Sequence, residues 1–446
     1  MIDSEPRGQP LPTEETQGWG RFPRQRSRVF SPQSVDQLRA FLRGDSESSV
    51  APRGLGRSYG DASLNEGGAA VAMTGLAGIH SFSPSTGIID LDAGVSLDSL
   101  IRTTLPTGHF LSVTPGTRCV TIGGAIASDV HGKNHHRVGS FSTQVIDFDL
   151  VTAQGELLRC SREENPAVFW ATVGGMGLTG FIVQARVQLR AVESSFVLVQ
   201  YERAATLSET LAGLERGDRE YEYTLAWLDL TAGGPRVGRS LLMFGRHATA
   251  SELPSKWEPF APPSGLRFSV PFPVPVAPKG PGLIGAFNAV YLAIHRAGSE
   301  EFVDFGRFFH PLDTVGEWNR LFGDRGFIEC QFVVPNKAAE EVLTRAARAI
   351  RSAGRAPLLG VLKRFGEPSG GMLSFPRPGT TASLDLPVDH RLPGIVRALE
   401  EILLEHGGRV YLAKDAVQSP RLFSQGYPRL EEFRLVQRQV DPHRRL

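Results

Sequence analysis

The chain is poor in cysteine and has almost no net charge. Its 446 residues include only three cysteines, Cys119, Cys160 and Cys330, which are widely spaced and odd in number. This spacing indicates neither a disulfide framework nor a structural metal site, and we expect no metal. The 48 Lys and Arg residues balance 47 Asp and Glu residues to a net charge of +1. Without a global basic field, nucleic-acid binding is not expected.

Long apolar runs are also missing. No window approaches 18 uninterrupted apolar residues, and residues 1–7 are polar. The sequence therefore predicts a soluble protein with neither a secretory signal nor a membrane-spanning helix. The hydrophobic content of 41% is typical of globular proteins.

The length predicts two domains. We place a solvated arm at residues 1–30, a first domain at 18–190 that is completed by 409–446, and a second domain at 191–408. The basic run at residues 24–28 is interpreted as part of the solvated arm rather than as a binding tail.

Short strand-like and helical segments follow one another without a regular βαβ repeat, which indicates an α+β fold. Strands are predicted at residues 69–73, 88–91, 145–152, 196–201 and 223–230. Helices are predicted at 96–105 with Ser96 as cap, 207–215, 283–294, 336–353 with Asn336 as cap and Gly354 as stop, and 393–406.

Residues 252–282 are interrupted by prolines, which occur at almost every second position between 269 and 278. This pattern excludes a helix and a central strand and predicts an extended, mobile loop. The loop is also apolar. It could cover an apolar substrate or pack on the domain surface, and the sequence favours neither.

Three glycine-rich segments lie within about 130 residues, at 53–61, 115–124 and 173–180. Glycine lets backbone N–H groups approach a ligand, and successive N–H groups suit a pyrophosphate. The first segment lacks the Rossmann spacing and by itself fits a tight turn equally well. The small residues at 121–128 suit a helix start that faces phosphate. Together the three segments favour one large dinucleotide ligand.

Residues 131–136 contain three histidines and a lysine, unlike an ordinary packed element. With the other motifs, this segment resembles the decaprenylphosphoryl-β-D-ribose 2-oxidase family, within the vanillyl-alcohol-oxidase-type flavoprotein superfamily. The resemblance covers about residues 18–442 and is carried by the motifs at 18–21, 53–61, 131–136, 169–175, 309–313, 316–319, 374–376 and 413–415. It implies an FAD-binding domain and a substrate-binding domain built on an antiparallel sheet.

The same resemblance implies that FAD is held noncovalently. The implied FAD contacts are Arg53, Gly54, Leu55, Gly56, Arg57, Ser58, Tyr59, Gly60, Asp61, Gly116, Thr121, Ile122, Gly123, Gly124, Ser128, Asp129, His131, Ile182 and Tyr411. Tyr59 could stack on the flavin or simply pack. The reaction implied is hydride transfer from the ribose C2 carbinol to the flavin, which gives a 2-keto sugar for cell-wall arabinan synthesis. An NADH-dependent short-chain keto-reductase would then complete the epimerisation to arabinose.

Lys414, His131 and Lys133 match residues near the flavin and are the candidate catalytic groups. From the residues alone, a surface pair between Lys414 and Asp415 would be preferred. The candidate substrate contacts are Lys363, Gln331, Phe309, Ser383 and Trp227. Lys363 suits a phosphate or sugar.

The departures from the family lie on the substrate side. Ser383 replaces a cysteine, Thr381 an asparagine, Phe309 a tyrosine and Glu329 a glutamine. Thiol-directed covalent inhibitors are therefore expected to fail.

Two other functions compete with the ribose oxidase. One is an oxidase of the same superfamily that acts on a soluble aldonolactone or alditol. The other is a noncatalytic flavin-binding protein, which predicts loss of Lys414 or of the histidine motif, and both are present. A lipid-linked substrate implies peripheral contact with a membrane. The resemblance leaves open the cytoplasm and the membrane surface, including its periplasmic face.

Overall fold

The computed structural model describes residues 11–44, 48–231, 237–263, 268–274, 281–295, 298–358 and 360–446. Its N-terminal region begins with a four-stranded sheet in the order β1-β2-β4-β3. The strands are β1 (Thr13–Gln17), β2 (Arg24–Phe30), β3 (Val50–Arg53) and β4 (Ala69–Ala72). Helix α1 (Val35–Gly44) follows β2 and buries Leu38 and Leu42.

The prediction of a solvated arm over residues 1–30 is wrong for the part that the structure describes. Strand β2 pairs in parallel with β4, and β1 pairs antiparallel with β2. Within the basic run, exposed Arg24 and Arg26 precede Ser27, which is buried. The Oγ atoms of Ser27 and Thr16 lie 3.2 Å apart across the pair. The basic residues thus occupy the solvent side of a strand.

A five-stranded antiparallel sheet follows, in the order β5-β6-β10-β8-β9. Its strands are β5 (Ile79–Ser83), β6 (Ile88–Asp92), β8 (Val145–Val151), β9 (Leu157–Ser161) and β10 (Phe181–Gln188). The helices of this region are α2 (Leu97–Thr104), α3 (Ile122–Ala127), α4 (His135–Val138) and α5 (Pro166–Thr172). The predicted cap of α2 is confirmed, because Ser96 Oγ accepts a hydrogen bond from Ser99 N at 3.1 Å.

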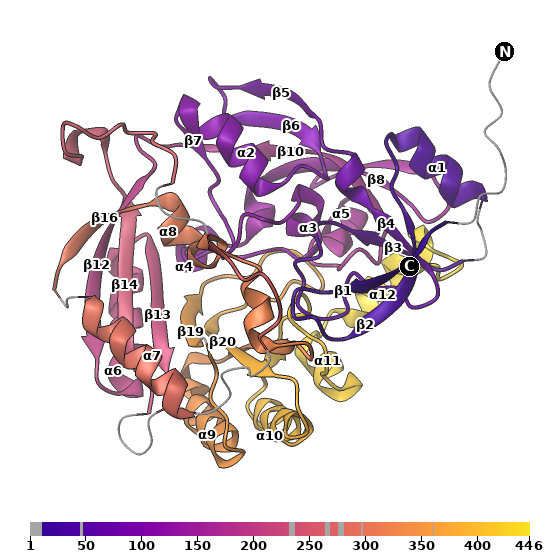
Figure 1. The fold of residues 1–446 in the computed structure, drawn as a ribbon. Coiled ribbons are helices and arrows are strands. Elements are labelled where there is room, and N and C mark those ends of the chain that lie inside the picture. Colours follow the sequence, from indigo (N-terminus) through magenta and orange to yellow (C-terminus); the bar gives the residue numbers. More distant parts are fainter. Residues whose placement is uncertain are drawn as a thin grey trace.

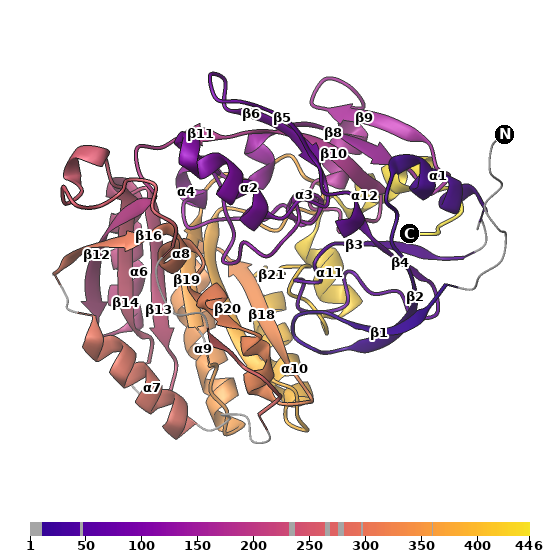
Figure 2. The same ribbon diagram turned by 45° about the horizontal axis from the view of Figure 1, so that its top comes forward.

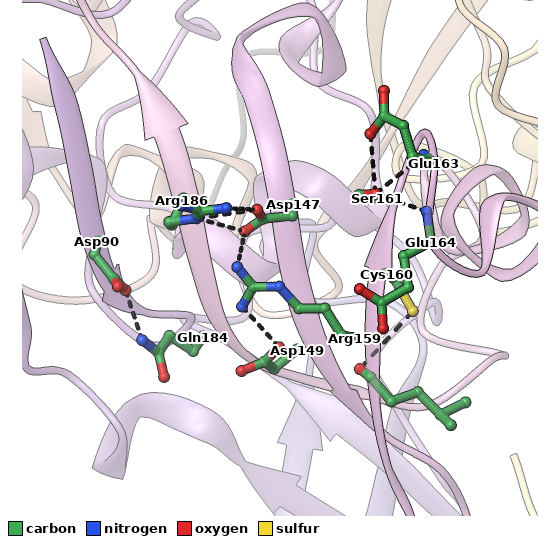
Figure 3. A network of polar contacts seen from close by, with 11 residues as sticks. Asp90, Asp147, Asp149, Arg159, Cys160, Ser161, Glu163, Glu164, Gln184 and Arg186 are labelled. Atoms are coloured by element: carbon green, nitrogen blue, oxygen red, sulfur yellow. Dashed lines mark hydrogen bonds and ion pairs between the residues drawn. The ribbon is translucent and has the colours of Figure 1, made fainter. Parts of the chain in front are cut away.

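One face of this sheet carries a network of charged side chains (Figure 3). Arg159 donates to Asp149 at 2.9 Å and to Asp147 at 2.7 Å, and Arg186 also binds Asp147. The arginine side chains are 33% and 43% exposed, and they cover the Asp147 carboxylate, which is 4% exposed. The opposite side chains, such as Phe148, are buried in the main core. The sheet therefore has one solvated and one buried face.

The second region is built on an eight-stranded antiparallel sheet in the order β16-β12-β14-β13-β19-β20-β18-β21. The strands are β12 (Phe196–Ala204), β13 (Tyr223–Asp229), β14 (Arg239–His247), β16 (Glu300–Asp304), β18 (Phe327–Val334), β19 (Gly360–Phe365), β20 (Gly379–Pro387) and β21 (Arg409–Val410). Helices α6 (Leu207–Glu220), α9 (Ala339–Ser352) and α10 (Leu392–Glu405) lie along this sheet (Figures 1 and 2). Their apolar faces and one face of the sheet form a second core.

The helix predicted at 336–353 begins differently from the expectation. Residues 336–338 form a 3-10 turn, and α9 starts at Ala339. Asn336 is not a side-chain cap, because its Oδ1 accepts a hydrogen bond from Thr380 Oγ1 of β20 at 2.8 Å. Gly354 does end the helix, with φ +67°.

The C-terminal segment joins both regions. Strand β21 pairs with β18 of the eight-stranded sheet. Helices α11 (Pro420–Gly426) and α12 (Leu430–Val440) follow, and the chain end returns to the four-stranded sheet (Figure 1). Arg445 Nη1 donates to the carbonyl of Leu42 at 2.9 Å. The start of the predicted completing segment thus belongs to the second sheet, and its end packs on the first region.

The proline-rich segment is described only in part, since residues 264–267 and 275–280 lie outside the described residues. Strand β15 (Phe268–Ser269) pairs in parallel with β17 (Val315–Gly316), and Val274 N donates to the carbonyl of Arg320 at 2.9 Å. Helix α7 (Pro281–Ile294) follows, as predicted, and α8 (Phe305–Phe309) precedes β17. A short pair, β7 (His109–Phe110) and β11 (Arg190–Ala191), leads into the second region. Within the described residues, no helix is long and apolar enough to cross a membrane.

Candidate active site

One cavity of about 820 Å³ is lined by both regions of the molecule. The N-terminal region contributes its glycine-rich loops, and the eight-stranded sheet contributes side chains from β13, β18, β19 and β20. Its volume falls in the range of about 300–1,000 Å³ that is typical of small-molecule and cofactor sites. The cavity is therefore the candidate active site.

The glycine segments predicted to approach one ligand do meet at this cavity. A Cβ atom on Gly54 would lie 2.5 Å from Thr121 Oγ1 at the start of α3. Thr121 caps α3, and its Oγ1 accepts a hydrogen bond from Gly124 N at 3.1 Å. A Cβ atom on Gly60 would lie 1.7 Å from the carbonyl oxygen of Asp415. Glycine fits these positions because the capping side chain of Thr121 approaches Gly54 closely and the backbone of Asp415 approaches Gly60 closely.

Most of the predicted FAD contacts line the cavity. These are Gly54, Leu55, Gly56, Arg57, Ser58, Tyr59, Gly116, Thr121, Gly123, Gly124, Ser128, His131, Ile182 and Tyr411. The structure places Arg53, Gly60, Asp61, Ile122 and Asp129 outside the cavity lining.

Two of the residues outside the lining have clear structural partners. Arg53 Nη2 donates to the carbonyl of Gln17 at 2.8 Å. The Asp129 carboxylate accepts hydrogen bonds from Ser142 N at 3.1 Å and from Ser369 Oγ at 2.6 Å. Both side chains therefore tie loops together.

Three neighbouring strands present alternate residues to the cavity. The register of β18 and β20 pairs Glu329 with Asp385 and Gln331 with Ser383. Strand β19 pairs with β20 so that Lys363 lies opposite Thr381. Because side chains alternate between the faces of a sheet, the residues between these positions, such as Leu384 and Leu362, enter the second core. The polar residues share the face that lines the cavity.

Glu329 accepts hydrogen bonds from two residues at this face. Its Oε2 accepts a hydrogen bond from Lys414 Nζ at 2.7 Å, and its Oε1 accepts one from Ser383 Oγ. Lys414 Nζ also lies 3.5 Å from the centroid of the Tyr59 ring. The alternative pair between Lys414 and Asp415 is wrong, because Asp415 Oδ1 instead accepts hydrogen bonds from two backbone N–H groups.

Asp385 lies opposite Glu329 and was missed as a site residue by the sequence analysis. It is 3% exposed, and its Oδ2 has no hydrogen-bond partner within the described residues. Burial, and then the charge of Glu329, raise the pKa of Asp385 well above its usual value. The alternation of Thr381, Ser383 and Asp385 along one strand was the signal that could have revealed it.

His131 is held in the cavity by Gln331. The Gln331 amide nitrogen lies 3.0 Å from His131 Nε2, and an amide nitrogen can only donate. One of the two ring nitrogens of His131 is thus engaged by Gln331. Burial, with a smaller effect of Lys363, lowers the pKa of His131 well below its usual value. The ring is neutral and packs against Tyr411, whose hydroxyl donates to the carbonyl of Ser128 at 2.9 Å.

Two further lysines line the cavity. Burial, and then the charge of Lys363, lower the pKa of Lys133 to about 7. Burial, and then the charge of Lys414, lower the pKa of Lys363 to about 8. Lys133 Nζ donates to the carbonyl of Phe308 and lies 4.2 Å from the centroid of that ring. Both lysines are poised to bind an anion, which would restore their full positive charge.

The predicted apolar contacts, Phe309 and Trp227, also line the cavity. Phe309 packs edge-on against Tyr223, with ring centroids 4.9 Å apart. Trp227 stacks on Tyr291 of α7 at 4.4 Å. These aromatic rings form an apolar wall beside the lysines.

Two family models match the chain, the FAD binding domain at residues 27–161 and D-arabinono-1,4-lactone oxidase at residues 320–446. Decaprenylphosphoryl-beta-D-ribose oxidase of Mycolicibacterium smegmatis is 38% identical over 97% of this chain and 95% of that protein. The chain belongs to the decaprenylphosphoryl-β-D-ribose oxidase family. L-gulono-1,4-lactone dehydrogenase of Mycobacterium tuberculosis is 21% identical over 96% of both chains. Cytokinin dehydrogenase 2 of Arabidopsis thaliana is 30% identical over 36% of this chain and 33% of that protein.

Membership of this family makes the chain an FAD-dependent oxidoreductase of two-domain α+β architecture. The cavity fits this cofactor. The loops at 54–59 and 121–124 lie on one side of it, and Ile182 adds apolar surface. Because Gly54 lies so close to Thr121, there is no room for a side chain at residue 54, where the two loops meet. Among the described residues, no three His, Cys, Asp or Glu side chains come together as metal ligands.

Proposed function

We propose that this protein oxidises the C2 hydroxyl of decaprenylphosphoryl-β-D-ribose to the 2-keto sugar, the first half of its epimerisation to the arabinose form. FAD, when bound, supplies the hydride acceptor for this oxidation. The observation that carries the proposal is the shared cavity. It joins the glycine loops of the FAD-binding domain to a face of the eight-stranded sheet, and its lining includes three lysines and an apolar aromatic wall. The relationship to the Mycolicibacterium oxidase along 97% of the chain supports the same substrate.

The side chains suit the two parts of such a substrate. Lys133 and Lys363, with exposed Arg307 at the cavity margin, would bind the phosphate. His131 and Lys414 would orient the sugar hydroxyls. Trp227 and Phe309 would exclude water from the reacting carbon.

The residues that line the loop side would hold FAD without a covalent bond. His131 is a buried histidine of the lining, and Gln331 already engages its Nε2. Acid precipitation of the purified protein tests this, since noncovalent FAD should remain in the supernatant. A yellow pellet would contradict it.

The direct test is anaerobic mixing of the flavin-loaded protein with polyprenylphosphoryl ribose while flavin absorbance is followed. Bleaching of the flavin is expected, together with formation of the 2-keto sugar. A protein that retains FAD and stays oxidised with this donor would refute the proposed substrate.

A second candidate is oxidation of a soluble aldonolactone or alditol. The match of residues 320–446 to the D-arabinono-1,4-lactone oxidase family favours it. So does the polar character of Glu329 and Ser383 on the substrate side. Bleaching by a free lactone or alditol, but not by the lipid-linked ribose, would establish this alternative.

We also propose peripheral contact with a membrane, because the substrate is a lipid. Phe268 and Phe272 are 63% and 66% exposed, and Val290 and Ile294 of α7 are 61% and 67% exposed. Ile294, and Gly316 beside β15, line the cavity, so these apolar side chains lie near its margin. Co-sedimentation with anionic liposomes should fall in a Phe268→Ser/Phe272→Ser variant. Equal sedimentation of variant and wild type would contradict the contact.

The 2-keto product must be consumed by a reduction at C2 to complete epimerisation. We propose an NADH-dependent short-chain keto-reductase as the functional partner. A coupled assay with such a reductase should convert lipid-linked ribose to lipid-linked arabinose. Accumulation of the keto sugar despite an active reductase would exclude this coupling.

A further inference from the structure

The cavity wall carries two carboxyl groups directly opposite each other. Glu329 of β18 and Asp385 of β20 are cross-strand partners on the same face of the sheet, and both line the cavity. Cross-strand partners have Cβ atoms about 4.5–5.5 Å apart. Their exposed fractions are 7% and 3%. Two carboxylates that share such a buried site cannot both carry a charge at neutral pH without a matching pair of cations.

Among the residues that the structure describes, Lys414 is the cation that binds this pair directly. Lys414 Nζ binds Glu329 Oε2 at 2.7 Å, and Ser383 Oγ donates to Oε1. Asp385 Oδ2 has no hydrogen-bond partner within the described residues. The raised pKa of Asp385 agrees with this geometry, because burial and the Glu329 charge both favour its protonated form. The pair therefore holds one proton and one negative charge beside Lys414.

Oxidation of a carbinol needs a group that accepts the hydroxyl proton. His131 is poorly suited, because Gln331 engages its Nε2 and burial lowers the pKa of the imidazole well below its usual value. Lys133 donates to the carbonyl of Phe308. Lys363, whose pKa is about 8, is the competing group. The carboxyl pair is an ionised acceptor that faces the cavity. The other lining carboxyl groups, Asp313 and Glu317, are bound by Thr117 and Arg320.

We propose that Glu329 and Asp385 act as one proton acceptor for the substrate hydroxyl, with their single negative charge held in place by Lys414. The inference rests on the proposed function. As the substrate is oxidised, the C–H bond breaks and its electron pair leaves with the hydrogen as a hydride to FAD. The O–H bond breaks, the C=O bond forms, and the proton goes to the carboxyl pair. The pair then carries two protons and no charge.

If the two carboxyl groups share one negative charge, each can carry it when the other is substituted. If Glu329 becomes glutamine, Asp385 is the remaining carboxyl near Lys414 and takes over the negative charge. If Asp385 becomes asparagine, Glu329 keeps it. Either single variant should retain a proton acceptor, and only the double variant should lose it.

The experiment compares the rate of anaerobic flavin reduction by polyprenylphosphoryl ribose in wild type, E329Q, D385N and E329Q/D385N. Each single variant should lie within about 10-fold of wild type. The double variant should fall by about 100-fold or more, the usual contribution of general-base catalysis. Glu222, which precedes β13, binds Arg190 of β11 and does not line the cavity, provides the control variant E222Q. A double variant as fast as wild type would overturn the proposal, and so would a 100-fold loss in one single variant.

A second readout does not depend on turnover. Infrared difference spectra of the flavin-loaded proteins at pH 7 should show a neutral carboxyl band in wild type that disappears in both single variants. Lys414, Lys363, Tyr59 and Ser383 face the pair and are unchanged in these variants. Persistence of the band in E329Q would overturn the shared charge even if the double variant fails to fold.

Failure of the proposed function would look different. A wild-type protein that polyprenylphosphoryl ribose does not reduce would refute the substrate. The same four variants would then be compared with the lactone or alditol that does reduce it. Loss of reduction only in the double variant would still support the carboxyl pair, and no loss would overturn it.

Discussion

Replacing Lys414 by alanine should destabilise the protein in a pH-dependent way. The side chain of Glu329 is 8% exposed, and Lys414 is the cation bound to it. Removing one partner of a buried ion pair typically costs about 3–5 kcal/mol, because the other charge stays buried. Glu329 can escape part of this cost by taking up a proton. From an ordinary glutamate pKa of about 4.3, protonation costs about 3.7 kcal/mol at pH 7 and about 1 kcal/mol at pH 5.

The expected loss in the free energy of unfolding is therefore about 3–4 kcal/mol at pH 7 and about 1 kcal/mol at pH 5. The sign follows from linkage. In the variant the folded state binds a proton that the unfolded state releases, so its stability falls as pH rises above about 4.3. Urea unfolding of wild type and K414A with FAD in excess, at both pH values, measures the difference.

Two controls separate this cause from others. The double variant K414A/E329Q keeps Asp385 as the remaining carboxyl, which burial holds in its protonated form without Lys414, and should recover most of the stability lost in K414A. The exposed Lys337 provides K337A, which should match wild type. A loss below 1 kcal/mol at pH 7, or an equal loss at both pH values, would refute the reasoning.

Three further outcomes are expected. The Gly60→Ala variant should lose about 3 kcal/mol of unfolding free energy and most of its bound flavin, because the added Cβ would lie 1.7 Å from the Asp415 carbonyl oxygen. Urea unfolding and flavin absorbance measure these two losses. The Thr121→Ala variant should lose about 1 kcal/mol of unfolding free energy, measured with urea, because the Thr121 hydroxyl caps α3. The Thr121→Ser variant keeps this hydroxyl and should not lose stability. Binding of the anionic substrate at pH 8 should take up protons in calorimetry with different buffers. The pKa of Lys363 is about 8 before binding, and a nearby phosphate raises it; K363M should reduce the uptake.

Local signals in the sequence predicted much of the fold. The helix after Ser96 has its cap hydrogen bond within four residues, and Gly354 ends α9 with a positive φ. Such features depend on neighbours in the chain. The strands β1 and β2 could not be predicted in this way, because β2 is defined by pairing with β4 about 40 residues later. Asn336 was misread for the same reason, since its partner Thr380 is on another strand.

The candidate site shows the same division. The glycine loops could be predicted to approach one ligand because their composition restricts what they can do, and the structure brings Gly54 against Thr121. Asp129 is one of the FAD contacts that the resemblance implies, yet its carboxylate binds Ser142 and Ser369 and does not line the cavity. A motif gives the position of a residue in the chain. It does not give the direction of the side chain.

The resemblance identified Glu329 only as a departure from the family, and its meaning depends on the register of the sheet. Because Glu329 neutralises Lys414 and Asp385 stays protonated, these three groups together carry no net charge. The positive charge available to a phosphate then comes from Lys133 and Lys363, whose pKa values of about 7 and 8 lie near neutrality. The ionisable groups of the cavity thus have two functions. Lys414, Glu329 and Asp385, which together carry no net charge, face the carbinol and can take up a proton. Lys133 and Lys363 gain positive charge when the anion binds.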